Sequence, residues 1–394
     1  MRSSEANITA NVEASDPTLR YLRLVGSILC LMIFSSNVWT MSQWNERRGV
    51  ADDLCYLRQA HLFQQFGYHG LDTDILPETD NYFRKLVNEA GHPEWHSANG
   101  SWCHVQMAAT GKRVIQYPPG TGFLLAAFPE GFQVIPLYAT ATFLISLIAI
   151  FAISVARSKI DIAIATAFGC LALYFMINPA KASYSIPPTL VICAVVGFLT
   201  AAFFNATERR SRLGLIFMIG ILLGISVNFR VANLVLSVAY FAALLIAFAW
   251  TRRMDNFWQG ALFGLAYLIG MLPTLLANAL NAGSPFSTTY GPDDTQTRHF
   301  VFSVASQYFS ELQGVLILAG IAGVVGILIQ RPSQSLKQTA ILVAGNLLAN
   351  LAFFLVHPIY QQFYLIPVAM LSFWTLLFGV LKTPLAAPTT KLRK

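Results

Sequence analysis

FQVIPLYATATFLISLIAIFAISV, residues 132–155, is a stretch without a single charged side chain. An α-helix needs roughly 20 apolar residues to cross the hydrocarbon core of a bilayer, and this stretch is long enough. Lipid offers the backbone no hydrogen-bond partner, so a segment that crosses it must satisfy its own N–H and C=O groups as a helix. Residues 132–155 therefore predict a transmembrane helix.

Apolar runs of similar length recur on both sides of this stretch. The 394-residue chain is 55% hydrophobic and only 11% charged, with a mean hydropathy of +0.55, which is more apolar than a soluble core can accommodate. We therefore predict an all-α polytopic integral membrane protein, with a membrane domain over residues 21–382 between an N-terminal tail, 1–20, and a basic C-terminal tail, 383–394. The ten predicted spans are 21–40, 132–155, 161–179, 187–206, 213–230, 231–251, 260–280, 311–330, 338–356 and 363–381.

Lys and Arg residues concentrate in alternate short loops and in the two tails. Because such residues favour the cytoplasmic side, we predict both termini in the cytoplasm and the loops 41–132 and 281–300 in the periplasm of a bacterial inner membrane. The net charge of +7 then reflects topology and contact with anionic lipids of the bilayer. The basic residues lie at span ends and not along one face, so no nucleic-acid partner is predicted.

The loop 41–132 is far longer than any other connection, and long loops tend to carry function. An acidic pair, Asp52 and Asp53, begins an amphipathic pattern that predicts a helix along the membrane surface, ending near Gly67. Residues 122–129 are apolar but too short to span, which predicts a helix that dips into the outer leaflet.

Two explanations fit the acidic pair Asp52 and Asp53. Asp is a favoured residue at the start of a helix, where negative charge is stabilised. Alternatively, a carboxylate close to lipid and to a second carboxylate has a raised proton affinity, which suits a general base near neutral pH. One Asp could begin the helix while the other reacts.

The loop returns to the membrane through Tyr117, Pro118, Pro119 and Gly120. The two prolines fix the backbone and exclude helix, so this segment is either a rigid turn or a rigid support for a site. As a site element, it would hold the Tyr117 hydroxyl close to Lys112 and Arg113, at the depth of a phosphate headgroup.

Arg230 lies between the fifth and sixth predicted spans without a polar loop around it. A charge in that position needs a partner or access to water, so Arg230 either reaches the outer interface or binds a lipid phosphate. Lys181, Arg298 and His357 are further interface residues of the same kind.

Cys55 and Cys103 both fall in the loop 41–132, where an oxidising compartment could join them. The spacing of the nearby His and acidic residues fits no standard metal motif, so no metal ligand is assigned, although a divalent metal is left open. No nucleotide-binding or dinucleotide-binding motif occurs, so no cofactor is predicted and energy must come with the substrate. The residues considered for a metal are His92, Glu94, His96, Cys103 and His104.

Five short segments occur in order along most of the chain. They are Asp52, Asp53, Tyr56 and Ala60 after the first predicted span, YPPG at 117–120, GILLGISVNFR at 220–230, LPTLLANALNAGSPFSTTY at 272–290, and FYLIP at 363–367. Together they resemble the GT-C superfamily of integral membrane glycosyltransferases, close to the protein mannosyltransferase and aminoarabinose transferase type, which use lipid-linked sugars.

The resemblance implies a polyprenyl-phosphate-linked sugar as donor, an acceptor that enters from outside, and inversion at the anomeric carbon. Asp52 would be the general base, and Asp53 would orient or assist it. Tyr117, together with Lys112, Arg113 or Arg230, would hold the departing lipid phosphate. Further candidate site residues are Tyr56, Tyr290 and His357.

The chain also departs from this family. The turn at 183–188, SYSIPP, holds no carboxylate where many relatives carry an Asp, and Cys55, Tyr117 and Phe363 replace basic residues of the family. We therefore expect a periplasmic glycosyltransferase that acts on an envelope glycan, lipid or protein. The alternatives are a transporter or flippase of a lipid-linked sugar, or an inactive GT-C-like scaffold that binds the lipid.

Overall fold

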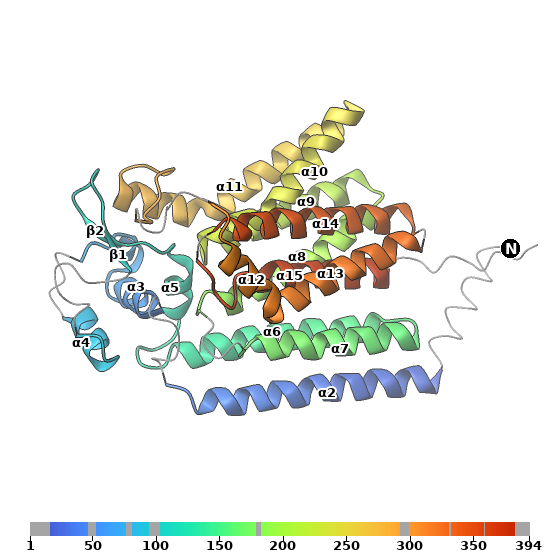
Figure 1. Ribbon diagram of the computed structural model, residues 1–394, viewed down its shortest axis with the longest axis horizontal. Helices are drawn as coiled ribbons and strands as arrows, with labels where there is room; N and C mark the ends of the chain where they lie inside the picture. Colours follow the sequence, from blue (N-terminus) through green and yellow to red (C-terminus); the bar gives the residue numbers. More distant parts are fainter. Residues whose placement is uncertain are drawn as a thin grey trace, which may run out of the picture.

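The protein consists of a long bundle of helices with a smaller, mixed region at one end (Figure 1). This region, residues 53–133, is named the head. The computed structural model describes residues 16–45, 53–75, 81–93, 103–178, 183–291, 299–330, 332–357 and 359–382.

Each of the ten predicted spans contains a helix, and eight of the helices are long and apolar enough to cross a membrane. The described part of the chain is therefore that of an all-α, multi-pass membrane protein, as predicted. The remaining two, α7 and α15, have 17 residues each. The bundle helices are α2 (Pro17–Ser42), α6 (Val134–Val155), α7 (Lys159–Phe175), α8 (Ile186–Asn205), α9 (Arg209–Val227), α10 (Val235–Thr251), α11 (Met254–Ala282), α13 (Leu312–Ile329), α14 (Gln334–Leu355) and α15 (Ile366–Lys382).

The head begins with the helix predicted after the acidic pair, which ends as expected where Gly67 adopts a φ of 58°. Two short helices outside the bundle core, α4 and α12, and one β-hairpin were not predicted, because strands of three residues are too short to reveal an alternating pattern. The head elements are α3 (Asp53–Phe66), η1 (Gly67–Leu71), α4 (Tyr82–Glu89), β1 (His104–Gln106), β2 (Arg113–Ile115) and α5 (Gly120–Leu125); α12 (Phe302–Ser310) precedes α13.

The helices α9 and α11 pack so closely that only glycine fits at their contact. A Cβ atom on Gly224 would lie 2.2 Å from the carbonyl oxygen of Tyr267, and one on Gly270 would lie 2.3 Å from that of Ile221. Small residues allow such approach, which is how membrane helices gain contact without a hydrophobic driving force. The Gly-rich segment 220–230 therefore places the end of α9 directly against α11.

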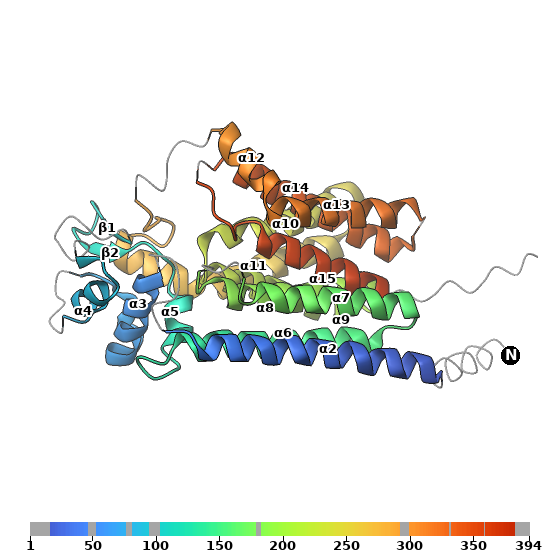
Figure 2. The same cartoon turned by 60° about the horizontal axis from the view of Figure 1, so that its bottom comes forward.

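The centre of the bundle is formed by α8 and α15, while α2 lies at its edge. Gly197 of α8 packs against Trp374 of α15, where an added Cβ would lie 2.6 Å from the Trp374 Cβ. By contrast, only 22% of the apolar window of α2 is buried, and α2 contacts α6 and α7 along one side (Figure 2). The rest of its apolar surface is available to lipid.

The loop predicted at 281–300 begins later than expected. Helix α11 runs to Ala282, and Gly283 with a φ of 83° ends it. Asn281 is therefore a helical residue, which presents its side chain to the head and not to a solvent loop: its Oδ1 accepts a hydrogen bond from the backbone N–H of Thr73 at 3.0 Å.

Candidate functional site

Asp53 is fully buried in the first turn of α3. Its Oδ1 accepts a hydrogen bond from the Ser183 hydroxyl at 2.9 Å and another from the Tyr184 backbone N–H at 3.0 Å. The turn between α7 and α8, which has no carboxylate of its own, thus meets the acidic helix with hydrogen-bond donors. Asp52, the predicted general base, lies outside the described residues, as do Lys181 and Arg298.

Three tyrosines from three separate segments meet beside α3. The Tyr117 ring of YPPG lies 5.3 Å from the Tyr56 ring of α3 and 6.0 Å from the Tyr290 ring. Gln59 donates to the Tyr117 carbonyl at 3.1 Å, and Gln116 donates to its hydroxyl at 3.1 Å. Tyr56, Tyr117 and Tyr290, each singled out from a different motif, therefore form one cluster.

The head is joined to the bundle at the residues that follow α9. The Gly120 N–H of YPPG donates to the Asn228 carbonyl at 2.7 Å, and a Cβ on Gly120 would lie 2.7 Å from the same oxygen. Next along the chain, the Phe229 carbonyl accepts from the hydroxyls of Tyr56 at 3.5 Å and Thr121 at 3.4 Å. These contacts bring α3 and YPPG next to Arg230.

The half-buried Arg230 guanidinium lies over aromatic rings of the FYLIP segment. Its central carbon is 4.2 Å from the Tyr364 ring centroid and 4.9 Å from that of Phe363. No carboxylate in the described ranges forms an ion pair with Arg230. His357 lies on the other side of the same cluster, with its ring 5.8 Å from Tyr364. The cation is therefore held against aromatic rings, and no carboxylate of the described residues neutralises its charge.

Lys112 and Arg113 belong to the hairpin and contact other residues than Tyr117. The Lys112 ammonium forms an ion pair with Asp72 at 2.5 Å and donates to the Leu280 carbonyl at 3.1 Å. The backbone N–H of Arg113 donates to Asp74 at 3.1 Å. Both residues thus fasten the hairpin to its surroundings, whereas Arg230 directly follows Phe229, whose carbonyl accepts from the Tyr56 hydroxyl.

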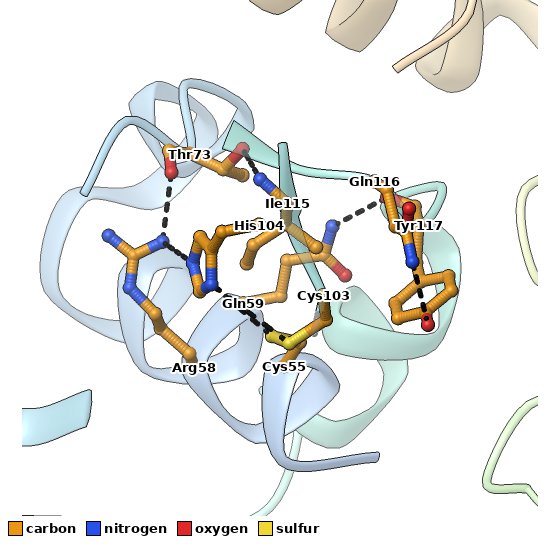
Figure 3. Close-up of a disulfide and its surroundings, with 9 residues drawn as sticks. All are labelled: Cys55, Arg58, Gln59, Thr73, Cys103, His104, Ile115, Gln116 and Tyr117. Carbon is orange, nitrogen blue, oxygen red and sulfur yellow. Dashed lines mark hydrogen bonds between the residues drawn. A yellow bond between two sulfur atoms is a disulfide. The ribbon is translucent and has the colours of Figure 1, made fainter. Parts of the chain in front are cut away.

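Cys55 and Cys103 form a disulfide that ties α3 to the start of β1 (Figure 3). His104 is buried beside it, and Arg58 Nη1 lies 3.1 Å from His104 Nε2. Arginine can only donate, so Nε2 accepts and the ring proton is on Nδ1, which faces the two sulfurs at 3.8 and 4.0 Å. Burial, followed by the charges of Arg58 and Arg113, holds the His104 pKa well below its usual range, so the ring is neutral.

Cys55, Cys103 and His104 are also a group of three potential metal ligands within the described residues. Their chemistry does not fit a metal, because the disulfide consumes both thiolates and the Arg58 donor keeps the His104 proton on the nitrogen that faces the sulfurs. Of the other residues considered for a metal, Glu94 and His96 lie outside the described residues, while the His92 backbone N–H donates to the Val87 carbonyl.

Asn228, which was not predicted as a site residue, forms hydrogen bonds with two backbone groups of α11. Pro273 interrupts this helix, and the Thr274 N–H donates to Asn228 Oδ1 at 2.9 Å instead of to Gly270. Asn228 Nδ2 in turn donates to the Gly270 carbonyl at 2.7 Å. The available signal was an Asn two residues before Arg230 and a Pro within a predicted span, two features far apart in the sequence.

No protein-family model and no curated protein matches the chain. Its class is therefore defined by the fold itself, as a multi-pass membrane protein with a disulfide-linked head at one end.

Proposed function

We propose that the protein is a membrane glycosyltransferase of the GT-C type. It transfers a hexosyl or pentosyl unit from a polyprenyl-phosphate donor to a glycan, lipid or protein acceptor of the cell envelope, on the periplasmic face of a bacterial inner membrane. The observation that carries the proposal is the contact of α3 and YPPG with the backbone of Asn228 and Phe229, immediately before Arg230. It joins the carboxylate helix to this cation at one end of the bundle.

In the proposed reaction, one residue acts as the general base and two others stabilise the leaving group. The Asp52 carboxylate takes the proton of an acceptor hydroxyl, whose oxygen attacks the anomeric carbon from the side opposite the leaving group. As the new carbon–oxygen bond forms, the bond from the anomeric carbon to the phosphate oxygen breaks and polyprenyl phosphate leaves. The configuration at the anomeric carbon is inverted in the product. Arg230 and the Tyr117 hydroxyl stabilise the negative charge that develops on the phosphate.

Asp53 has a positioning role in this proposal. Its bonds to Ser183 and Tyr184 fix the first turn of α3 against the start of α8, and they keep the carboxylate buried. In this proposal Asp52 acts next to an anchored residue in the chain, which favours a reproducible geometry for proton transfer.

Two observations support the proposed location. The Cys55–Cys103 disulfide is typical of an oxidising compartment, which favours a periplasmic head. Four arginines lie at the opposite end of the bundle, which favours the cytoplasm on that side: Arg209 and Arg210 begin α9, and Arg252 and Arg253 connect α10 to α11.

The broken helix α11 is the feature that a transporter would share, since transporters bind substrates at unwound helices near the bilayer midplane. Here the break between Gly270 and Thr274 begins 16 residues, or about 24 Å, after Met254 and ends 8 residues, or about 12 Å, before Ala282, and the Asn228 that fills it also contacts Gly120 of the head. Asn228 satisfies the Gly270 carbonyl and the Thr274 N–H. The break is thus filled by a side chain and adjoins the head, which favours the enzyme over the transporter or flippase.

The test follows release of labelled sugar from polyprenyl phosphate in membranes that contain the protein. Asp52→Asn and Arg230→Gln should each lower transfer at least 100-fold, as expected for loss of a general base or of an electrostatic contact to the leaving group. Asp255→Asn is the matched control, because Asp255 pairs with Arg209 at the far end of the bundle. Transfer by Asp52→Asn at the parental rate would refute the base assignment, and a parent without transfer would favour the inactive scaffold.

A further inference from the structure

A second concave site lies at the end of the bundle opposite the head. It is a cavity of about 570 Å³ between the last turns of α6, α8 and α15 and the first turns of α9. Three phenylalanines, Phe151, Phe198 and Phe378, provide its apolar wall, and Arg157 and Lys382 provide two cations. None of the described residues that line it is acidic.

Polar and apolar groups are arranged in order of depth. Phe151, Phe198 and Phe378 each lie one helical turn, about 6 Å, further from the helix end than Val155, Ala202 and Lys382 respectively. The three rings therefore lie deeper in the bundle than Lys382 at the end of α15 and than Arg157, which follows the end of α6. This is the profile of one lipid molecule and not of a soluble ligand.

The fold does not need these two cations for its own helix ends. The carbonyl at the end of α6, on Ala156, accepts from Arg23 Nη2 at 2.7 Å and Nε at 3.2 Å. At the end of α8, the Phe203 carbonyl accepts from the Ala206 N–H at 3.3 Å.

The cations also have no acidic partner in the described part of the chain. The nearest carboxylate to Arg157 in the sequence, Asp161, is engaged in the capping box of α7 with Ser158. The Lys382 ammonium lies 3.9 Å from the centre of the Phe198 ring, which holds it over the cavity wall.

We propose that this cavity is a binding site for an anionic glycerophospholipid of the adjacent leaflet. Its phosphate binds Arg157 and Lys382, and an acyl chain packs along Phe151 and Phe198, which the buried Phe378 ring supports from behind. Basic pockets between transmembrane helices bind such headgroups, whereas the cation of a zwitterionic headgroup would lie against two like charges. The site is independent of the proposed transferase reaction.

Native mass spectrometry of the delipidated full-length protein in neutral detergent tests this site. Phosphatidylglycerol should be retained as one tightly bound copy, at least about tenfold more tightly than phosphatidylcholine, because two cations contribute to binding. Arg157→Gln with Lys382→Gln should abolish this preference, and the exposed Arg157→Gln alone should reduce it. The matched control removes two exposed cations at the same end that do not line the cavity, Arg20→Gln with Arg253→Gln, and should retain the preference.

Three results would overturn the proposal. If the cavity variants and the control variant lose the preference for phosphatidylglycerol equally, the lipid is bound only by general surface charge. Equal retention of phosphatidylcholine would show ordinary packing of annular lipid. Glycerol 3-phosphate that competes as strongly as the intact lipid would show a free-phosphate site, in which the phenylalanine wall has no part.

Discussion

Asn228 Oδ1 accepts a hydrogen bond from the Thr274 N–H, which in a regular helix would donate to the Gly270 carbonyl. The Asn228 side chain thus makes two hydrogen bonds to α11, in place of the one that would join Thr274 to Gly270. The backbone carbonyl of Asn228 accepts a further hydrogen bond from the Gly120 N–H of YPPG. One residue therefore links the break in α11 to the segment that joins the head to the bundle.

Replacing Asn228 by Ala should lower the free energy of unfolding by about 1–3 kcal/mol, because it leaves a buried N–H and a buried C=O of α11 without partners. The midpoint of thermal unfolding in detergent measures the effect. The control is Asn278→Ala, four residues beyond Thr274, since the half-buried Asn278 side chain donates to the Pro285 carbonyl at 3.3 Å and fills no gap in a helix. Equal midpoints for the two variants would contradict this account.

Gly224→Ala should disrupt the contact between α9 and α11, because the new methyl group would have to occupy the space of the Tyr267 carbonyl. Overpacking of this kind costs about 1–3 kcal/mol, and detergent-solubilised protein should elute partly as aggregate in size-exclusion chromatography. Gly214→Ala on the same helix meets no atom within 4 Å, so it should be neutral or stabilise by up to about 1 kcal/mol through helix propensity. A stable Gly224→Ala protein would refute the packing argument.

Removal of the disulfide by Cys55→Ala with Cys103→Ala should destabilise the protein by up to about 4 kcal/mol, from the loop entropy of a sequence separation of 48. Thermal unfolding with and without reductant measures this, and reductant should affect the parent but not the double variant. Cys170→Ala provides the control, because Cys170 is a free cysteine of α7. A parent insensitive to reductant, with thiols already open to alkylation, would argue against the bond.

Because His104 is buried and neutral, we expect the protein to lose stability in acid. Its folded pKa lies well below the unfolded value of about 6.5, so below that value the unfolded chain binds a proton that the folded protein excludes. Stability should therefore be fully present above pH 7 and fall as the pH drops through 6.5 toward the folded pKa, by up to about 1.4 kcal/mol per pH unit.

His104→Gln should flatten this part of the profile of unfolding midpoint against pH. Gln can still accept from Arg58 and donate toward the sulfurs, but it does not titrate. His69→Gln, at an exposed imidazole, should leave the parental slope in place. If both variants keep that slope, other groups control the acid response.

Part of the candidate site follows from local sequence and part does not. The helix after the acidic pair and its end at Gly67 were predictable, because an amphipathic pattern and a glycine at positive φ are local signals. The contact of Asp53 with Ser183 was not, since it spans 130 residues and replaces an expected carboxylate by a hydroxyl. Likewise, the sequence placed Lys112 only five residues from Tyr117, while the structure pairs its ammonium with Asp72.

By itself, the sequence determined that this protein is a helical, multi-pass membrane protein, because apolar length and the lack of lipid hydrogen bonds allow no other backbone structure. It also marked Arg230 as a charge in need of an explanation. Only the tertiary structure decided what surrounds that charge: the rings of Tyr364 and Phe363, with YPPG and α3 against the two preceding residues. Contacts between helices depend on side-chain shape at sites far apart in the chain, which no local pattern encodes.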